Sequence, residues 1–150
     1  MAFIIENSNG DTLLTGATPL DMTTGGVYYF KRCKFGSPRR KIAIDSSPSA
    51  KGSFAQDFDD HSWPITGGSI LLNSSSVTTI KQLYESYSLL IANQIGLELT
   101  IPDGVSATYP NCVCTMFEAV RRPDGRTVVP NGDGSLYRMY IEMEFLQLSK

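Results

Sequence analysis

Few side chains in this sequence suit catalysis, and they form no recognisable constellation. His61 is the only histidine, so a histidine-based triad or metal centre would have to be built around it. Asp57, Asp59 and Asp60 lie just before it, and an Asp-x-Asp spacing can hold a hard cation. An EF-hand loop also needs a glycine at its sixth position and a glutamate at its twelfth, and neither falls there after Asp57. We interpret this segment as a solvated acidic loop, with a cation site as the alternative.

The three cysteines favour a structural role. An odd number of thiols fits a reducing compartment better than a secreted disulfide framework. Cys112 and Cys114 are two residues apart in an expected strand, so their side chains should point the same way. A zinc site would need a second cysteine or histidine pair, and beyond Cys33 only His61 is left. The sequence therefore predicts buried free thiols and no metal.

Phosphate-binding motifs are also missing from the sequence. Neither Gly25-Gly26 nor Gly67-Gly68 belongs to a Gly-x-Gly-x-x-Gly segment that opens a helix or to a P-loop. We therefore expect no catalytic residue and no cofactor, and we predict that the chain is not an enzyme.

Aromatic side chains are better candidates for recognition. The expected strand Val27–Phe35 mixes aromatic residues with cations on both faces, and Tyr137–Leu148 carries apolar residues on its polar face. Long strand edges of this kind invite pairing with another chain. The residues that we predict at an interface are Tyr28, Phe30, Phe54, Phe58, Trp63 and Tyr140. As an alternative, Trp63 and the aromatics of Tyr28–Phe30 form a platform for carbohydrate or peptide.

Short strands and one helix must position these residues. Patterns typical of strands cover residues 3–5, 12–15, 27–35, 41–45, 65–72, 97–101, 108–118, 127–129 and 137–148. Apolar residues recurring three and four apart predict one helix over about residues 78–95. Thr79 opens a capping-box pattern, Thr78 and Ser76 are competing caps, and Gly96 stands where a left-handed C-cap is expected.

A long irregular region interrupts this pattern at about residues 36–64, and we expect a loop or arm there. Ser46–Ser53 is flexible in composition, and Phe54, Phe58 and Trp63 are bulky anchors among polar residues. Loops of this length are uncommon in a compact domain unless they are functional or become ordered on binding. The predicted fold is one mainly β domain over residues 1–150, an antiparallel β-sandwich or partly closed barrel flanked by one α-helix.

Composition limits the possible partners. The formal net charge of −2 argues against sequence-independent nucleic-acid binding, which needs a dense cationic face. No segment is apolar for 18 residues, so no membrane span is expected. The N-terminal residues 1–6 have neither a basic region nor a long apolar run, so we expect no signal peptide and synthesis in the cytoplasm.

The order of elements from residue 77 onward resembles a known family. The expected helix is followed by the strand Leu97–Ile101, by Pro102-Asp103-Gly104, and by the run Ala107–Val113, which contains Tyr-Pro-Asn-Cys. A strand ending near Phe117-Glu118 and the closing aromatic strand Tyr137–Phe145 complete the order. This arrangement is similar to the tail-tube and distal-tail superfamily of long-tailed bacteriophages, whose fold is a β-sandwich flanked by one helix.

The resemblance implies a structural virion protein that acts by self-association. It implies a hexameric ring in the tail, as tube, distal-tail or baseplate hub, or neck, with other tail or neck proteins as partners and DNA only as channel contents. In that family the long segment between early strands reaches the adjacent subunit or ring. No catalytic residue is carried over.

Overall fold

Ten strands and one helix make up the described part of the chain. The computed structural model describes residues 2–18, 24–37, 39–46, 53–103, 105–130 and 135–148, and for residues 39–46, 53–61, 103, 105 and 106 it describes the backbone alone. In chain order the elements are β1 (Ala2–Glu6), β2 (Thr12–Ala17), β3 (Gly26–Lys31), β4 (Lys34–Phe35), β5 (Arg39–Ser46), β6 (Ser53–Ser74), α1 (Val77–Ala92), β7 (Leu97–Asp103), β8 (Val105–Ala119), β9 (Val129–Pro130) and β10 (Tyr137–Gln147).

Seven strands close into a barrel, and β4, β5 and β9 lie outside it. Hydrogen-bonded neighbours follow the order β6, β3, β2, β1, β7, β8 and β10, and β10 then pairs with β6 to complete the circuit. The pairing of β2 with β3 is parallel and rests on Ala17 and Tyr28, and the other pairings are antiparallel. The predicted mainly β fold, a partly closed barrel with one helix, is confirmed.

Barrel closure corrects the prediction of a spare strand edge for Tyr137–Leu148. The expected strand Val27–Phe35 is two strands, because its pairing with β6 shifts between Tyr29 and Lys31, stops after Lys31 and resumes at Lys34. The strand β3 lies between β2 and β6, and β10 lies between β6 and β8. The strand β10 therefore has paired neighbours on both sides, whereas β3 pairs with β6 along its length but with β2 only at Tyr28.

The helix is shorter than predicted and begins at a different cap. Ser76 is the N-cap, and its side chain accepts a hydrogen bond from the Thr79 backbone N–H at 3.3 Å. The helix ends at Ala92, with Asn93 as the C-cap. Gly96 has the expected left-handed backbone (φ +73°), but it lies beyond the helix, in the turn that leads into β7. The Thr79 cap and the Gly96 C-cap were therefore wrong.

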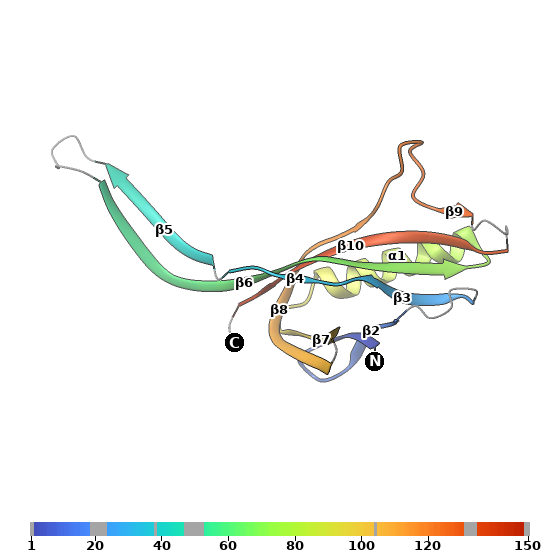
Figure 1. Ribbon diagram of the computed structural model, residues 1–150, viewed down its shortest axis with the longest axis horizontal. Helices are drawn as coiled ribbons and strands as arrows, with labels where there is room; N and C mark the ends of the chain where they lie inside the picture. The colour runs from blue at the N-terminus through green and yellow to red at the C-terminus, as the bar shows by residue number, and fades with distance from the viewer. Residues whose placement is uncertain are drawn as a thin grey trace.

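One stripe of the helix enters the core. Ile80 and Ile91 are fully buried, and Tyr84 stacks on Phe117 of β8 with ring centroids 6.1 Å apart. The end of the predicted stripe is exposed, because the helix stops before Ile95, which is 78% accessible. Figure 1 shows α1 running beside the strands β6 and β10.

The segment predicted as a loop or arm is an arm built from two strands. Over residues 39–46 and 53–62, β5 and the first part of β6 form an antiparallel hairpin. Figure 1 shows this hairpin leaving the barrel as a curved ribbon, continuous with the barrel portion of β6. Residues 47–52, most of the segment predicted to be flexible, lie outside the described residues.

Candidate assembly interface

Three of the six predicted interface residues meet on one face of the barrel. Tyr28 on β3 and Tyr140 on β10 both pair with Leu71 of β6, so the three side chains stand in one row across the sheet. Neighbouring residues such as Tyr29 and Ile141 alternate with this row and point into the core. The row therefore lies on the outer surface of the barrel. We call the outer surface of β3, β4, β6, β8 and β10 the outer face.

The centre of the outer face is aromatic. Phe30 meets Tyr140 edge to face, with ring centroids 5.4 Å apart, and the Arg138 guanidinium lies 5.8 Å from the centroid of the Tyr140 ring. Phe30 is 41% exposed, whereas Tyr28 is only 8% exposed and its hydroxyl lies 2.9 Å from that of Thr24. Phe30 and Tyr140 can therefore contact a partner, and Tyr28 mainly supports them. Aromatic residues and arginine are the types enriched in interface centres.

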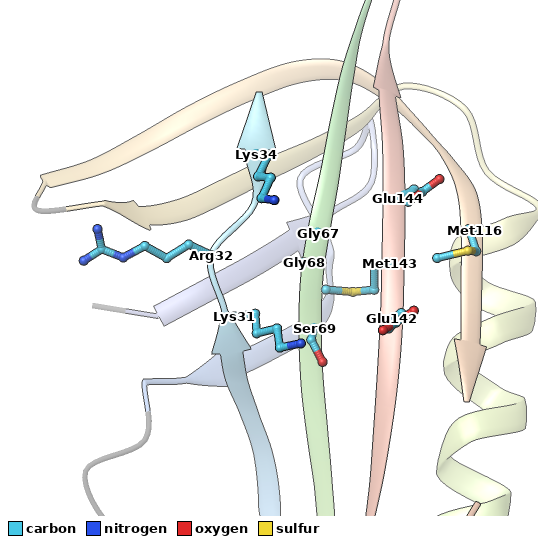
Figure 2. A pocket seen from close by; sticks show the side chains of 10 residues that line it. All are labelled: Lys31, Arg32, Lys34, Gly67, Gly68, Ser69, Met116, Glu142, Met143 and Glu144. Atoms are coloured by element: carbon cyan, nitrogen blue, oxygen red, sulfur yellow. The ribbon is translucent and has the colours of Figure 1, made fainter. Parts of the chain in front are cut away.

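A hollow of about 410 Å³ adjoins this aromatic centre. Its floor is the Gly67-Gly68-Ser69 segment of β6. Figure 2 shows Lys31 and Lys34 on one side of that segment, Glu142 and Glu144 on the other, and Arg32 pointing away. Met116 and Met143 complete the lining.

Three irregularities in strand pairing meet at the hollow. The pairing of β3 with β6 shifts between Tyr29 and Lys31, that of β10 with β6 between Met143 and Phe145, and that of β10 with β8 between Glu144 and Phe145. Bulges at neighbouring positions bend a sheet and redirect its side chains. The glycines allow the strands to come close here: a Cβ on Gly68 would lie 2.8 Å from the Cys33 sulfur.

The charges around the hollow do not neutralise one another. Among the described residues, no carboxylate lies within ion-pair distance of Lys31 or Lys34, and no cation lies within that distance of Glu142 or Glu144. Glu142 also stands directly opposite Glu118 of β8. Like charges opposite each other in an antiparallel pair are destabilising. The isolated chain thus presents a basic side and an acidic side with the glycine floor between them.

Trp63 lies elsewhere, at the base of the arm. It pairs with Gln147 at the end of β10, and it lines a second hollow, of about 220 Å³, together with Pro64. Phe35 and Tyr109 also line this hollow and stack with ring centroids 4.8 Å apart. Since Trp63 is eight residues along β6 from Leu71, roughly 26 Å in an extended strand, it cannot share a platform with Tyr28 and Phe30. The predicted alternative platform was therefore wrong in combining Trp63 with Tyr28 and Phe30.

The partners of Trp63 were missed because they are distant in the sequence. Phe35 and Tyr109 come from β4 and β8, and only strand pairing brings them to the arm base. The side chains of Phe54 and Phe58 belong to the arm and lie outside the described side chains. The charged residues around the first hollow formed no sequence motif, because only the strand register brings them together.

The cysteines are free and mostly sheltered. Cys112 is buried, and Cys33 and Cys114 are partly buried. Burial raises the pKa of the Cys112 thiol to about 12 and that of Cys114 to about 11, both well above the usual range of a cysteine. Cys112 joins Phe117 in the core, contrary to the expected alternation along β8, because the register shift around residue 115 exchanges the two faces. These thiols are suited to packing and poorly suited to nucleophilic chemistry.

No metal-binding cluster of histidine, cysteine or carboxylate side chains occurs among the residues whose side chains are described. Asp57, Asp59, Asp60 and His61 have undescribed side chains, so the proposed cation site lies outside this set. Among the described residues, no helix has the length and apolar character that a membrane crossing requires.

No protein-family model matches the chain, and no curated protein matches it either. The structural features that bear on function are a barrel with one helix, a projecting arm, an aromatic and charged outer face, and a small aromatic hollow at the arm base.

Proposed function

We propose that this protein is a structural subunit that works by self-association, forming a ring in the tail of a bacteriophage as tube, distal-tail hub or neck. The observation that carries this proposal is the arm. In the described structure β5 pairs with β6 alone, and the hairpin extends away from the barrel. A two-stranded hairpin by itself is marginally stable in water.

An exposed two-stranded ribbon of this kind gains most stability when it packs on the surface of another subunit. Its outer strand has unpaired backbone groups that can add to a sheet of a neighbouring subunit. In a ring each subunit gives its arm to one neighbour and receives the arm of the other, which is a heterologous contact that closes when the rotation suits. The resemblance from residue 77 onward to tail-tube and distal-tail proteins points to the same use.

Trimming the arm tests this function. Residues 46–53 can be replaced by Asn-Gly, since Asp45 pairs with Phe54 and a type I′ turn can close the shortened hairpin. A second variant replaces residues 43–56, next to the Ile42–Asp57 pair, in the same way. We expect assembly to weaken progressively while the melting temperature changes little, because the barrel core is untouched.

A matched control trims a different exposed turn. The segment Pro123–Gly125 forms a turn closed by the Gly125 N–H on the Arg122 carbonyl at 2.8 Å. Replacing it with Asn-Gly should leave assembly unchanged. Sedimentation velocity gives the oligomer size, and circular dichroism gives the melting temperature. Arm-trimmed variants that assemble like the parent protein, or that lose stability as much as assembly, would refute the role of the arm.

A second candidate function is a binding module for carbohydrate or peptide. The hollow at the arm base favours it, because Trp63, Phe35 and Tyr109 surround a space large enough for one ring. Trp63 is the only tryptophan, so its fluorescence reports on this hollow alone. A saturable shift during titration with oligosaccharides or proline-rich peptides, lost in Tyr109→Ala, would favour this function over ring formation.

A further inference from the structure

We propose that the outer face is a self-complementary contact, through which two copies of this chain pack with a two-fold axis running along β6. This contact is separate from the arm and goes beyond the proposed ring. The partner on the outer face is a second copy of the chain, because an identical face, rotated by the two-fold axis, would place opposite charges against those of the first.

The strand register places opposite charges symmetrically about β6. Lys31 pairs with Ser69 from one side, and Glu142 pairs with the same Ser69 from the other. Lys34 pairs with Thr66, and Glu144 lies between the pairs Met143–Gly68 and Phe145–Ile65, opposite Thr66 and Gly67. Each lysine therefore has a carboxylate at the same position along β6, on the strand at the other side of β6.

A two-fold axis along β6, lying in the contact plane, exchanges the two sides of this face. The basic side of one copy then lies over the acidic side of the other at unchanged levels. Each Lys31 meets the partner subunit's Glu142, and each Lys34 meets the partner subunit's Glu144. The operation makes all four contacts at once, as an isologous interface requires.

The aromatic centre follows the same symmetry. Phe30 belongs to β3 and Tyr140 to β10, on opposite sides of β6: Tyr140 pairs with Leu71, and Phe30 lies between the residues that pair with Ile70 and Ser69. The same rotation brings Phe30 of one copy to Tyr140 of the other. This places an aromatic contact beside the charged one, which is the usual arrangement of an interface centre and its rim.

The floor of the hollow permits close approach. Gly67 and Gly68 present no side chains, and Ser69 is 3% exposed, so the partner's long lysine and glutamate side chains have room above β6. The contact also relieves the opposition of Glu142 and Glu118, since the partner's Lys31 lies over that pair. Charge pairing of this kind fixes register and orientation more than it adds affinity.

Charge reversal tests this contact in the full-length protein. The acidic variant carries Lys31→Glu and Lys34→Glu, the basic variant carries Glu142→Lys and Glu144→Lys, and the swapped variant carries all four changes. We expect each two-residue variant to pair at least about tenfold more weakly than the parent protein, because like charges then face each other. A one-to-one mixture of the acidic and basic variants should regain pairing, and so should the swapped variant alone.

Sedimentation velocity at low and high salt measures these outcomes, and circular dichroism confirms that each variant is folded. Pairing in the parent protein should weaken as salt rises. A mixture that pairs no better than its components, or variants that associate like the parent, would overturn this contact and leave the face to a different partner. If the charge-reversal variants form rings like the parent protein, the proposed function stands and this contact is wrong. If subunits pair but form no rings, this contact stands and the proposed function is wrong.

Discussion

The close packing behind the glycine floor gives a sharp test of how β6 is built. A Cβ added at Gly68 would lie 2.8 Å from the Cys33 sulfur and 3.5 Å from the Met143 methyl carbon. The first distance is too short for a carbon–sulfur contact, so the Gly68→Ala variant must shift Cys33 or the strand. Cys33 cannot move freely, because its backbone N–H donates to the Tyr29 hydroxyl at 2.7 Å.

The expected cost follows from the chemistry of overpacking. Adding one methyl group to a tightly packed site typically costs about 1–3 kcal/mol. For a chain of this size, that corresponds to a fall in melting temperature of about 2–4 °C for each kcal/mol lost. Removing the sulfur with Cys33→Ala should restore most of the loss caused by Gly68→Ala. The coupling between the two substitutions should be at least about 1 kcal/mol, measured by urea unfolding of the two single variants and the double variant.

Gly67 provides the control. It has a left-handed backbone (φ +78°), and the nearest atom to an added Cβ is 3.6 Å away. Gly67→Ala should also destabilise, by about 1–2 kcal/mol, but through backbone strain. Cys33→Ala should therefore leave that loss unchanged. Equal rescue at both positions, or none at Gly68, would show that Cys33 does not fill the space behind the floor.

Two further changes test the helix and the thiols. Ser76→Ala should lower stability by about 1 kcal/mol in thermal unfolding, because the Thr79 N–H loses its acceptor, and Thr78→Ala should change little. Burial raises the pKa of Cys112 to about 12, so the folded chain keeps a proton there that the unfolded chain releases above about pH 9. The resulting stability is complete below that pH and falls as the pH rises toward about 12. Cys112→Ala should flatten this fall in urea unfolding at about pH 8 and pH 10.5, and an unchanged slope would contradict it.

Local patterns predicted much of the fold. Apolar residues three and four apart identified the helix around Ile80 and Ile91, and both are buried. The polar residues after β1 form a turn, because the Asn7 side-chain oxygen accepts from the Asn9 and Asp11 N–H groups. Period-two alternation also identified β10, where Met139 and Ile141 point inward. Each of these features depends on residues close together in the chain.

Long-range pairing could not be read in the same way. Alternation shows that β3 and β10 are strands but does not name their neighbours, so the closure of the barrel on β6 was missed. The strand β6 itself spans 22 residues, and its glycine pair and polar arm hid that continuity. The outer face was predicted only in part: Phe30 and Tyr140 were chosen as interface residues, but the symmetry of Lys31 and Glu142 about Ser69 exists only in the paired sheet.

Negative-stain electron microscopy of the purified, unmodified protein over a range of concentrations is the direct test of self-association. We expect ring-shaped particles with a central channel, which become more numerous as concentration rises. Particles the size of a single subunit at every concentration would contradict the proposed function.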